Sequence, residues 1–183
     1  MITEFFSTYF QSINHSILSI DVKKLQQIAD LIEKVAHNSN KVIIVGNGGS
    51  ASIASHVAVD LTKAAQIRAI NFNEANLITC FGNDYGYDNW VSAAFNSYAD
   101  AGDLVVIIIS SGKSPNMLNG ALKAKEMNLG VVTLSGFDVN NPLRKLGDIE
   151  LWVDSVEYNT VEMTHHIWLL AIVDYVIATK RTL

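Results

Sequence analysis

The pattern of hydrophobic and polar positions changes once along the chain, near residue 40. Residues 3–16 place aromatic and aliphatic side chains on one broad helical face. A second helix follows, with Ser19 or Asp21 as its N-terminal cap. Its apolar residues recur at intervals of three and four: Leu25, Ile28, Ile32 and Val35. The pattern predicts an antiparallel pair of helices over residues 1–38, with apolar faces suited to contact between subunits.

Beyond residue 39, short apolar runs alternate with helical patterns. Strands are predicted at 41–45, 67–71, 104–109, 130–134 and 149–153. Helices are predicted at 51–65, 74–81, 87–98, about 115–127 and 159–179, with a turn at 82–86. We therefore expect an α/β fold: a three-layer αβα sandwich with a central parallel sheet of about five strands. The chain is expected to form a single domain over 1–183, with 39–183 as the αβα core.

Composition narrows the class of protein. Hydrophobic residues make up 49% of the chain and charged residues 17%, which favours a large buried core over disorder. The net charge is −5 and no run of Lys or Arg stands out, so no contact with nucleic acid is predicted. A mean hydropathy of +0.22 favours helix faces buried in a partner subunit, and hence a homo-oligomer.

The single cysteine, Cys80, cannot form a disulfide within the chain, which fits a reducing cytoplasm. Its neighbours Leu77, Ile78 and Phe81 predict that it is a small core residue. The N-terminus lacks the basic segment of a signal peptide, and the apolar stretch 167–173 is too short to span a bilayer. We expect a soluble cytoplasmic protein without a membrane partner.

Two turns rich in Gly and Ser, at 46–50 and 110–114, each follow a predicted strand and precede a helix. Ligands of open parallel sheets bind beyond the C-terminal ends of the strands, where helix N-termini favour anions. Glycine allows close approach of the backbone, and serine hydroxyls donate hydrogen bonds. The second turn predicts a phosphate site made of Ser110, Ser111 and Ser114. Lys113 either neutralises part of the phosphate charge or is a solvated loop lysine.

Other interpretations of these turns stay open. Gly and Ser are common in turns and helix caps, so either turn alone also fits an ordinary connection. Gly46, Gly48 and Ala51 match a dinucleotide-binding fingerprint, which requires an acidic residue about 20 positions later. The chain has Asn71 and Asn73 there. The 110–114 turn also lacks the first glycine of a Walker loop, so both nucleotide interpretations rank low.

At these motifs the chain resembles the sugar isomerase (SIS) domain family and, within it, the phosphoheptose isomerases. The resemblance covers nearly the whole chain, most clearly at 46–61, 80–91, 101–116, 130–136 and the closing helix. It implies an αβα sandwich, a homotetramer with sites shared between subunits, and a phosphorylated sugar as ligand.

The resemblance also implies roles for individual residues. It assigns phosphate binding to Ser110, Ser111 and Ser114, and substrate contact to Asn47, Gly48, Gly49, Ser50, Asn83 and Asp84. His56 matches a histidine of the helix after the first turn, and Asp60 falls where the isomerases place a catalytic glutamate. Asp60 is one methylene shorter than Glu, which shortens its reach by about 1.5 Å. The family's histidine in the middle of the last helix is absent, and His165 and His166 lie a turn before that position.

Spacing groups these residues into a candidate acid–base or metal cluster. His56 and Asp60 share one helix face at i,i+4, as do Glu162 and His166, with His165 at i,i+3 from Glu162. Facing each other, His56, Asp60, Glu162 and His166 offer the nitrogen and oxygen ligands that zinc accepts. The pairs on the last helix also fit an ordinary solvated helix face. The sequence requires no cofactor, and zinc is a candidate ligand.

Two functions follow, from different classes. A phosphosugar isomerase of the sedoheptulose 7-phosphate type would use Asp60 as base and His166 or His165 as acid. The alternative is a non-catalytic member of the family that binds a phosphosugar or serves in protein assembly. The altered positions at Asp60 and in the last helix favour this alternative. A nucleotide-dependent enzyme is a weaker third reading.

Overall fold

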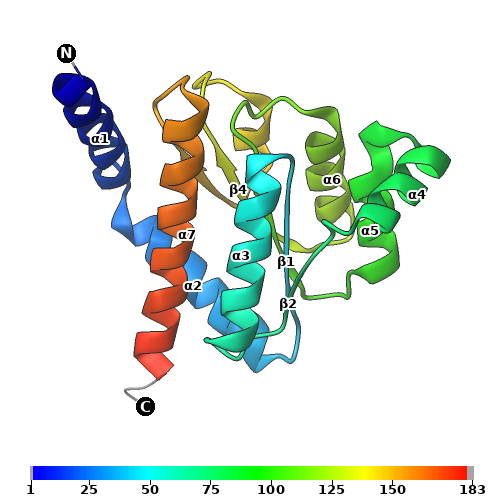
Figure 1. Cartoon of the computed structure of the whole chain (residues 1–183). Coiled ribbons are helices and arrows are strands. Elements are labelled where there is room, and N and C mark those ends of the chain that lie inside the picture. Colours follow the sequence, from blue (N-terminus) through cyan, green and yellow to red (C-terminus); the bar gives the residue numbers. More distant parts are fainter. Residues whose placement is uncertain (1, 181–183) are drawn as a thin grey trace.

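The computed structural model describes residues 2–180. Helix α1 (Ile2–Leu18) and helix α2 (Val22–His37) open the chain, and Asp21, not Ser19, caps α2 by accepting a hydrogen bond from the Lys23 N–H. Both helices pack along the closing helix α7 (Tyr158–Lys180), with α1 at its N-terminal part, and Figure 1 shows α1 and α2 end to end. The predicted pair of N-terminal helices is confirmed, but their antiparallel arrangement is wrong. Residues 19–21 join the two helices, but α2 does not fold back on α1. Each helix instead packs against α7.

Five parallel strands form one sheet in the order β2-β1-β3-β4-β5. Their bounds are β1 Val42–Gly46, β2 Ala69–Asn71, β3 Leu104–Ile108, β4 Gly130–Ser135 and β5 Ile149–Trp152. Strands β1 and β3 are neighbours in register, with Val45 opposite Ile107 and Gly46 opposite Ile108. The chain leaves β1 toward one edge of the sheet and leaves β3 toward the other. The two turns after these strands therefore emerge side by side at a topological switch point.

Alternate residues of the central strands enter two separate cores. Val42 and Ile44 of β1 pack with residues of α2, α7 and α3 (Gly49–Lys63). Ile43 and Val45 pack on the opposite face. The helices of that face are α5 (Trp90–Tyr98) and α6 (Pro115–Glu126), with α4 (Ala75–Tyr85) and the short turns η1 (Tyr87–Asn89) and η2 (Pro142–Lys145) beside them. Figure 1 shows these two helical layers, and the predicted three-layer sandwich is confirmed.

Two local predictions on helix α4 are wrong. The turn expected at 82–86 is helical as far as Tyr85, and only Gly86, with φ of +81°, ends the helix. Cys80 is exposed and is not part of the core, because α4 directs Leu77, Ile78 and Phe81 inward instead. Local apolar neighbours did not reveal which side of this helix faces the core.

Helix α7 is the one helix within residues 2–180 that is long and apolar enough to cross a membrane by composition. Its inner residues, including Trp168, Ile172 and Val176, are buried in the core shared with α2, α3 and the sheet. The apolar character of α7 is thus explained by packing inside the fold.

Candidate functional site

The two Gly/Ser turns meet in one cleft of about 260 Å³. It is lined by Asn47, Gly48, Gly49, Ser50, Ile109, Ser110, Ser111, Ser114, Tyr158 and Glu162. All the turn residues expected from the sequence thus lie in a single cleft. Helices α3 and α6 both begin there, so free backbone N–H groups and the positive ends of two helix dipoles face the same space.

The first turn needs glycine for its shape. Gly48 has φ of +53°, a left-handed conformation that side chains disfavour, and it stands immediately before α3. A Cβ on Gly49 would overlap the carboxylate of Glu162. Glycine at 48 and 49 therefore lets both the chain and the α7 side chain come close to the start of α3.

The second turn presents hydroxyls that are only partly engaged. Ser114 caps α6 without a side-chain capping bond, and Pro115 is the first residue of that helix. The hydroxyl of the buried Ser110 donates to Oε1 of Glu162 at 3.3 Å, and the Ser111 hydroxyl accepts from the Lys113 N–H at 3.3 Å. The three serines thus lie together in the cleft, with hydroxyls that can donate hydrogen bonds to an anion.

Glu162 and Tyr158 close the cleft from the first turns of α7. The sequence placed Glu162 in a possible metal cluster, whereas the structure places its carboxylate between Ser110 and Gly49. Tyr158 was not singled out from the sequence, and no local motif marks it. The N-terminal part of α7 thus forms the third wall of the site.

His56, Asp60 and His166 form a cluster next to this cleft. Nε2 of His56 lies 3.2 Å from Oδ2 of Asp60, and Nδ1 of His56 lies 2.9 Å from Nε2 of His166. Burial, and then the neighbouring His56, lower the pKa of His166, while Asp60 opposes the shift. Neutral His166 can accept or donate a proton, as acid–base catalysis requires.

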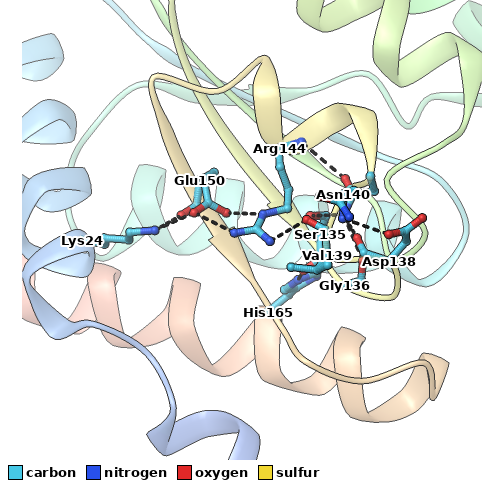
Figure 2. A network of polar contacts seen from close by, with 10 residues as sticks. Lys24, Ser135, Gly136, Asp138, Val139, Asn140, Arg144, Glu150 and His165 are labelled. Carbon is cyan, nitrogen blue, oxygen red and sulfur yellow. Dashed lines mark hydrogen bonds and ion pairs between the residues drawn. The ribbon is translucent and has the colours of Figure 1, made fainter.

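His165 faces away from the cluster, into the core. Its Nε2 lies 3.0 Å from the Ser135 carbonyl oxygen, and Figure 2 shows the two residues together. Complete burial lowers the pKa of His165 to about 4. Its Nδ1 has no hydrogen-bond partner among the described residues. Of the two histidines that the sequence left open, His166 is the one that reaches the candidate site.

Two predicted substrate residues do not line the cleft in this chain. Asn83 and Asp84 are exposed in the last turn of α4, where the Asn83 amide donates to Oδ1 of Asp84 at 2.9 Å.

Lys113 places its amino group 3.4 Å from Oδ2 of Asp138. The Asn140 N–H and Lys113 hold the pKa of Asp138 below its ordinary value. Lys113 thus pairs with a carboxylate, which reduces its availability to a phosphate.

The four proposed metal ligands do not converge on one point. Within residues 2–180, no group of three or more His, Cys, Asp or Glu side chains is arranged to hold a metal ion. The donor types suit zinc, but both ring nitrogens of His56 already face Asp60 and His166. Glu162 points to Ser110 instead. The side chains as placed do not fit a zinc site.

Asn116 is a site residue that sequence analysis did not identify. It is almost fully buried at the start of α6, and its amide pairs with the amide of Asn47. The Tyr87 hydroxyl also lies 3.5 Å from Oδ1 of Asn47. The only sequence signal for Asn116 is a polar residue directly after Ser114-Pro115, where a helix begins.

The chain is similar to known proteins in both sequence and structure. The SIS domain family matches residues 6–136. The phosphoheptose isomerase of Campylobacter concisus is 35% identical over 146 residues, covering 76% of this chain and 75% of that protein. The phosphoheptose isomerase of Sulfurimonas denitrificans is 31% identical over 150 residues, covering 79% and 76%. The structure of phosphoheptose isomerase from Neisseria gonorrhoeae has a TM-score of 0.88 and 27% identity, covering 96% of this chain and 99% of that one.

Proposed function

The chain belongs to the SIS domain family, and we propose that it is a phosphosugar isomerase that interconverts aldose and ketose forms of a sedoheptulose 7-phosphate type substrate. One observation carries the proposal: the cleft between the two Gly/Ser turns lies next to the cluster of His56, Asp60 and His166. The cleft supplies anion-binding groups, and the cluster supplies groups that move protons.

The phosphate would bind at the Ser110–Ser114 turn. Hydroxyls of Ser110, Ser111 and Ser114 and the N–H groups at the start of α6 are donors suited to phosphate oxygens. The turn at Asn47–Ser50 would lie along the sugar, with Glu162 accepting hydrogen bonds from its hydroxyls.

The two parts of the site are linked through α7. Glu162 at the cleft and His166 in the cluster are four residues apart on this helix, a rise of about 6 Å. A sugar that extends from the serine turn past Glu162 would bring its reacting carbons to the histidine cluster.

Isomerisation moves a proton from the carbon next to the carbonyl to the former carbonyl carbon, and moves another proton between the two oxygens. We assign the first role to the Asp60 carboxylate and the second to His166. His56 links these residues through its two ring nitrogens and fixes their orientation. The same side chains could bind zinc only if His56 and Glu162 left their present partners, and neither proton transfer requires a metal.

We further propose that the protein is a cytoplasmic homotetramer built from a single SIS domain. Its lone cysteine, Cys80, fits a reducing compartment. Phe5 and Phe10 of α1 are 64% and 63% exposed. A second copy of the chain would cover these aromatic side chains.

A second candidate is a non-catalytic phosphosugar-binding or assembly protein of the same family. Two observations favour it: Asp60 stands where the resemblance places a glutamate, and residues 168–170 of α7 contain no histidine. This candidate predicts stabilisation by a sugar phosphate without chemical conversion.

Turnover separates the two candidates. The full chain is incubated with sedoheptulose 7-phosphate in D₂O, and the sugar is followed by proton NMR. The isomerase proposal predicts an aldose product with deuterium incorporated next to the carbonyl carbon. A folded protein that binds the sugar phosphate but neither converts it nor exchanges its proton supports the non-catalytic candidate instead.

A further inference from the structure

The Ser110–Ser114 turn is hydrogen-bonded to the loop of residues 136–144, here named the support loop. The Gly136 N–H donates to the Ser110 carbonyl at 2.9 Å, and the Leu143 N–H donates to the Gly112 carbonyl at 3.3 Å. Lys113 and Asp138 add an exposed ion pair between the same two segments. The support loop thus contacts the turn at three of its residues: 110, 112 and 113.

Asn141 lies at the centre of the support loop and is fully buried. Its Nδ2 is 3.1 Å from the Ser135 hydroxyl, 3.1 Å from the Gly136 carbonyl and 2.9 Å from the Asp138 carbonyl. Its Oδ1 accepts from the Arg144 N–H at 3.4 Å. One side chain therefore organises both ends of the support loop. A buried amide with several partners is costly to remove, because those partners lose their hydrogen bonds.

The turn lies directly on this side chain. Gly112 has φ of +66°, and a Cβ at this position would overlap Oδ1 of Asn141. No side chain separates the Gly112 backbone from the Asn141 amide. Any displacement of Asn141 is therefore passed to the backbone between Ser111 and Ser114.

The support loop is itself attached to distant elements. Figure 2 shows Arg144 reaching Glu150 of β5, which also contacts Lys24 of α2. The Arg144 guanidinium lies over the Trp152 ring at 4.8 Å and donates to the Val139 carbonyl at 2.8 Å. The support behind the turn thus rests on the sheet and on α2, which gives it a fixed position.

We propose that Asn141 is a positioning residue that holds the Ser110–Ser114 turn in its phosphate-binding conformation. The inference rests on the proposed phosphate-binding role of this turn. Asn141 touches no ligand in this assignment and acts through Gly112 and the support loop.

Inorganic phosphate is the probe, and its dissociation constant is measured by calorimetry with the full chain. Asn141→Ala and the milder Asn141→Ser should each raise this constant, by on the order of tenfold for the alanine variant. Asn40→Ala is the matched control. Asn40 also donates to a backbone carbonyl and to a side chain, Ala101 at 2.9 Å and Asp103 at 3.3 Å, but it precedes β1, at the opposite end of that strand. The control should lower thermal stability and leave the phosphate affinity unchanged.

A double-mutant cycle distinguishes positioning from general destabilisation. Gly112→Ala should weaken phosphate binding because its methyl group pushes against Asn141. In the Asn141→Ala background the overlap with the amide oxygen and carbon is gone and only the contact with Cβ remains, so the added effect of Gly112→Ala should be smaller. Additive effects would overturn the proposal. Wild-type phosphate affinity in Gly112→Ala would overturn it even if the Asn141 variants fail to fold.

The outcomes separate this inference from the proposed function. Phosphate affinity that follows this pattern without turnover of a sugar phosphate leaves the inference standing and removes the isomerase assignment. Turnover of the sugar phosphate, together with wild-type phosphate affinity in the Asn141 variants, supports the isomerase assignment and overturns the inference about Asn141. Absence of phosphate binding by the unmodified chain overturns the phosphate role of the turn and the inference together.

Discussion

The side-chain amides of Asn47 and Asn116 form two reciprocal hydrogen bonds. Nδ2 of Asn47 donates to Oδ1 of Asn116 at 3.1 Å, and Nδ2 of Asn116 donates to Oδ1 of Asn47 at 2.9 Å. Asn47 belongs to the turn after β1, and Asn116 to the first turn of α6, beyond the turn after β3. This amide pair fixes the distance between the two halves of the cleft.

Loss of this pair should weaken substrate binding more than catalysis. Asn116→Ala leaves the Asn47 amide without its main partner and should cost about 1–2 kcal/mol of stability. We expect KM for the sugar phosphate to rise by roughly tenfold with little change in kcat, since ground-state and transition-state binding are affected alike. Steady-state kinetics measure both. Asn119→Ala on the same helix is the control, because its amide bonds to Asp88 and Asn89, outside the cleft. An equal rise of KM in both variants would contradict the assigned role of the pair.

Replacement of Asp60 tests the proton-transfer assignment. Asp60→Asn keeps the size of the side chain and removes the base, so turnover should fall by about 10²–10⁴-fold. Asp60 is partly exposed, so the melting temperature should change little. Asp174→Asn removes an exposed carboxylate from α7 and should retain full activity. Undiminished turnover in the Asp60 variant would show that another group removes the proton.

Removal of metal ions should leave the proposed reaction intact. His56 already orients Asp60 and His166 through its two ring nitrogens, and these two side chains carry both proton transfers of the proposed reaction. Treatment with a chelator followed by dialysis should therefore preserve turnover. Loss of activity that zinc restores would instead mean that His56, Asp60, Glu162 and His166 rearrange around the ion.

Acid stability should depend on a buried ion pair at the end of the sheet opposite the cleft. The Asp103 carboxylate is fully buried and contacts Lys41 Nζ at 2.6 Å. Burial opposes ionisation of Asp103, but the hydrogen bonds from Lys41 and two backbone N–H groups prevail and hold its pKa below the ordinary value of 3.8. The stabilisation is therefore present above about pH 3.8 and is lost as the pH falls through the lower pKa of the folded state.

Asp103→Asn removes this dependence. It leaves Lys41 buried beside only Asp100 and should lower the free energy of unfolding by about 3 kcal/mol at pH 7. The difference from the unmodified chain should shrink below pH 4, as measured by urea unfolding at several pH values. A difference that stays constant with pH would contradict the lowered pKa.

The strands, the two turns and the three layers could be predicted because their signals are local. Runs of β-branched residues followed by Gly and Ser identify strand ends, and parallel strands bring those ends to one edge. The exposure of Cys80 could not be predicted, because neighbours in sequence do not define the buried side of a helix. The end-to-end arrangement of α1 and α2 depends on α7, which lies more than 120 residues away.

The same limit applies to the candidate site. Ser110, Ser111 and Ser114 are marked by their turn, and His56 and Asp60 by their helical spacing. The position of Glu162 between Ser110 and Gly49 depends on the packing of α7 against α3. Asn116 and Asn141 are buried polar residues, and the pair Asn116–Asn47 and the contact of Asn141 with Gly112 join residues far apart in the sequence, so composition and spacing give no indication of them.

The most direct test of the account is a crystal structure of the protein with sedoheptulose 7-phosphate bound. The account predicts the phosphate in contact with Ser110, Ser111 and Ser114, and the C1 and C2 atoms next to His166 and Asp60. A phosphate bound elsewhere, or a sugar whose carbonyl lies away from His56, Asp60 and His166, would contradict it.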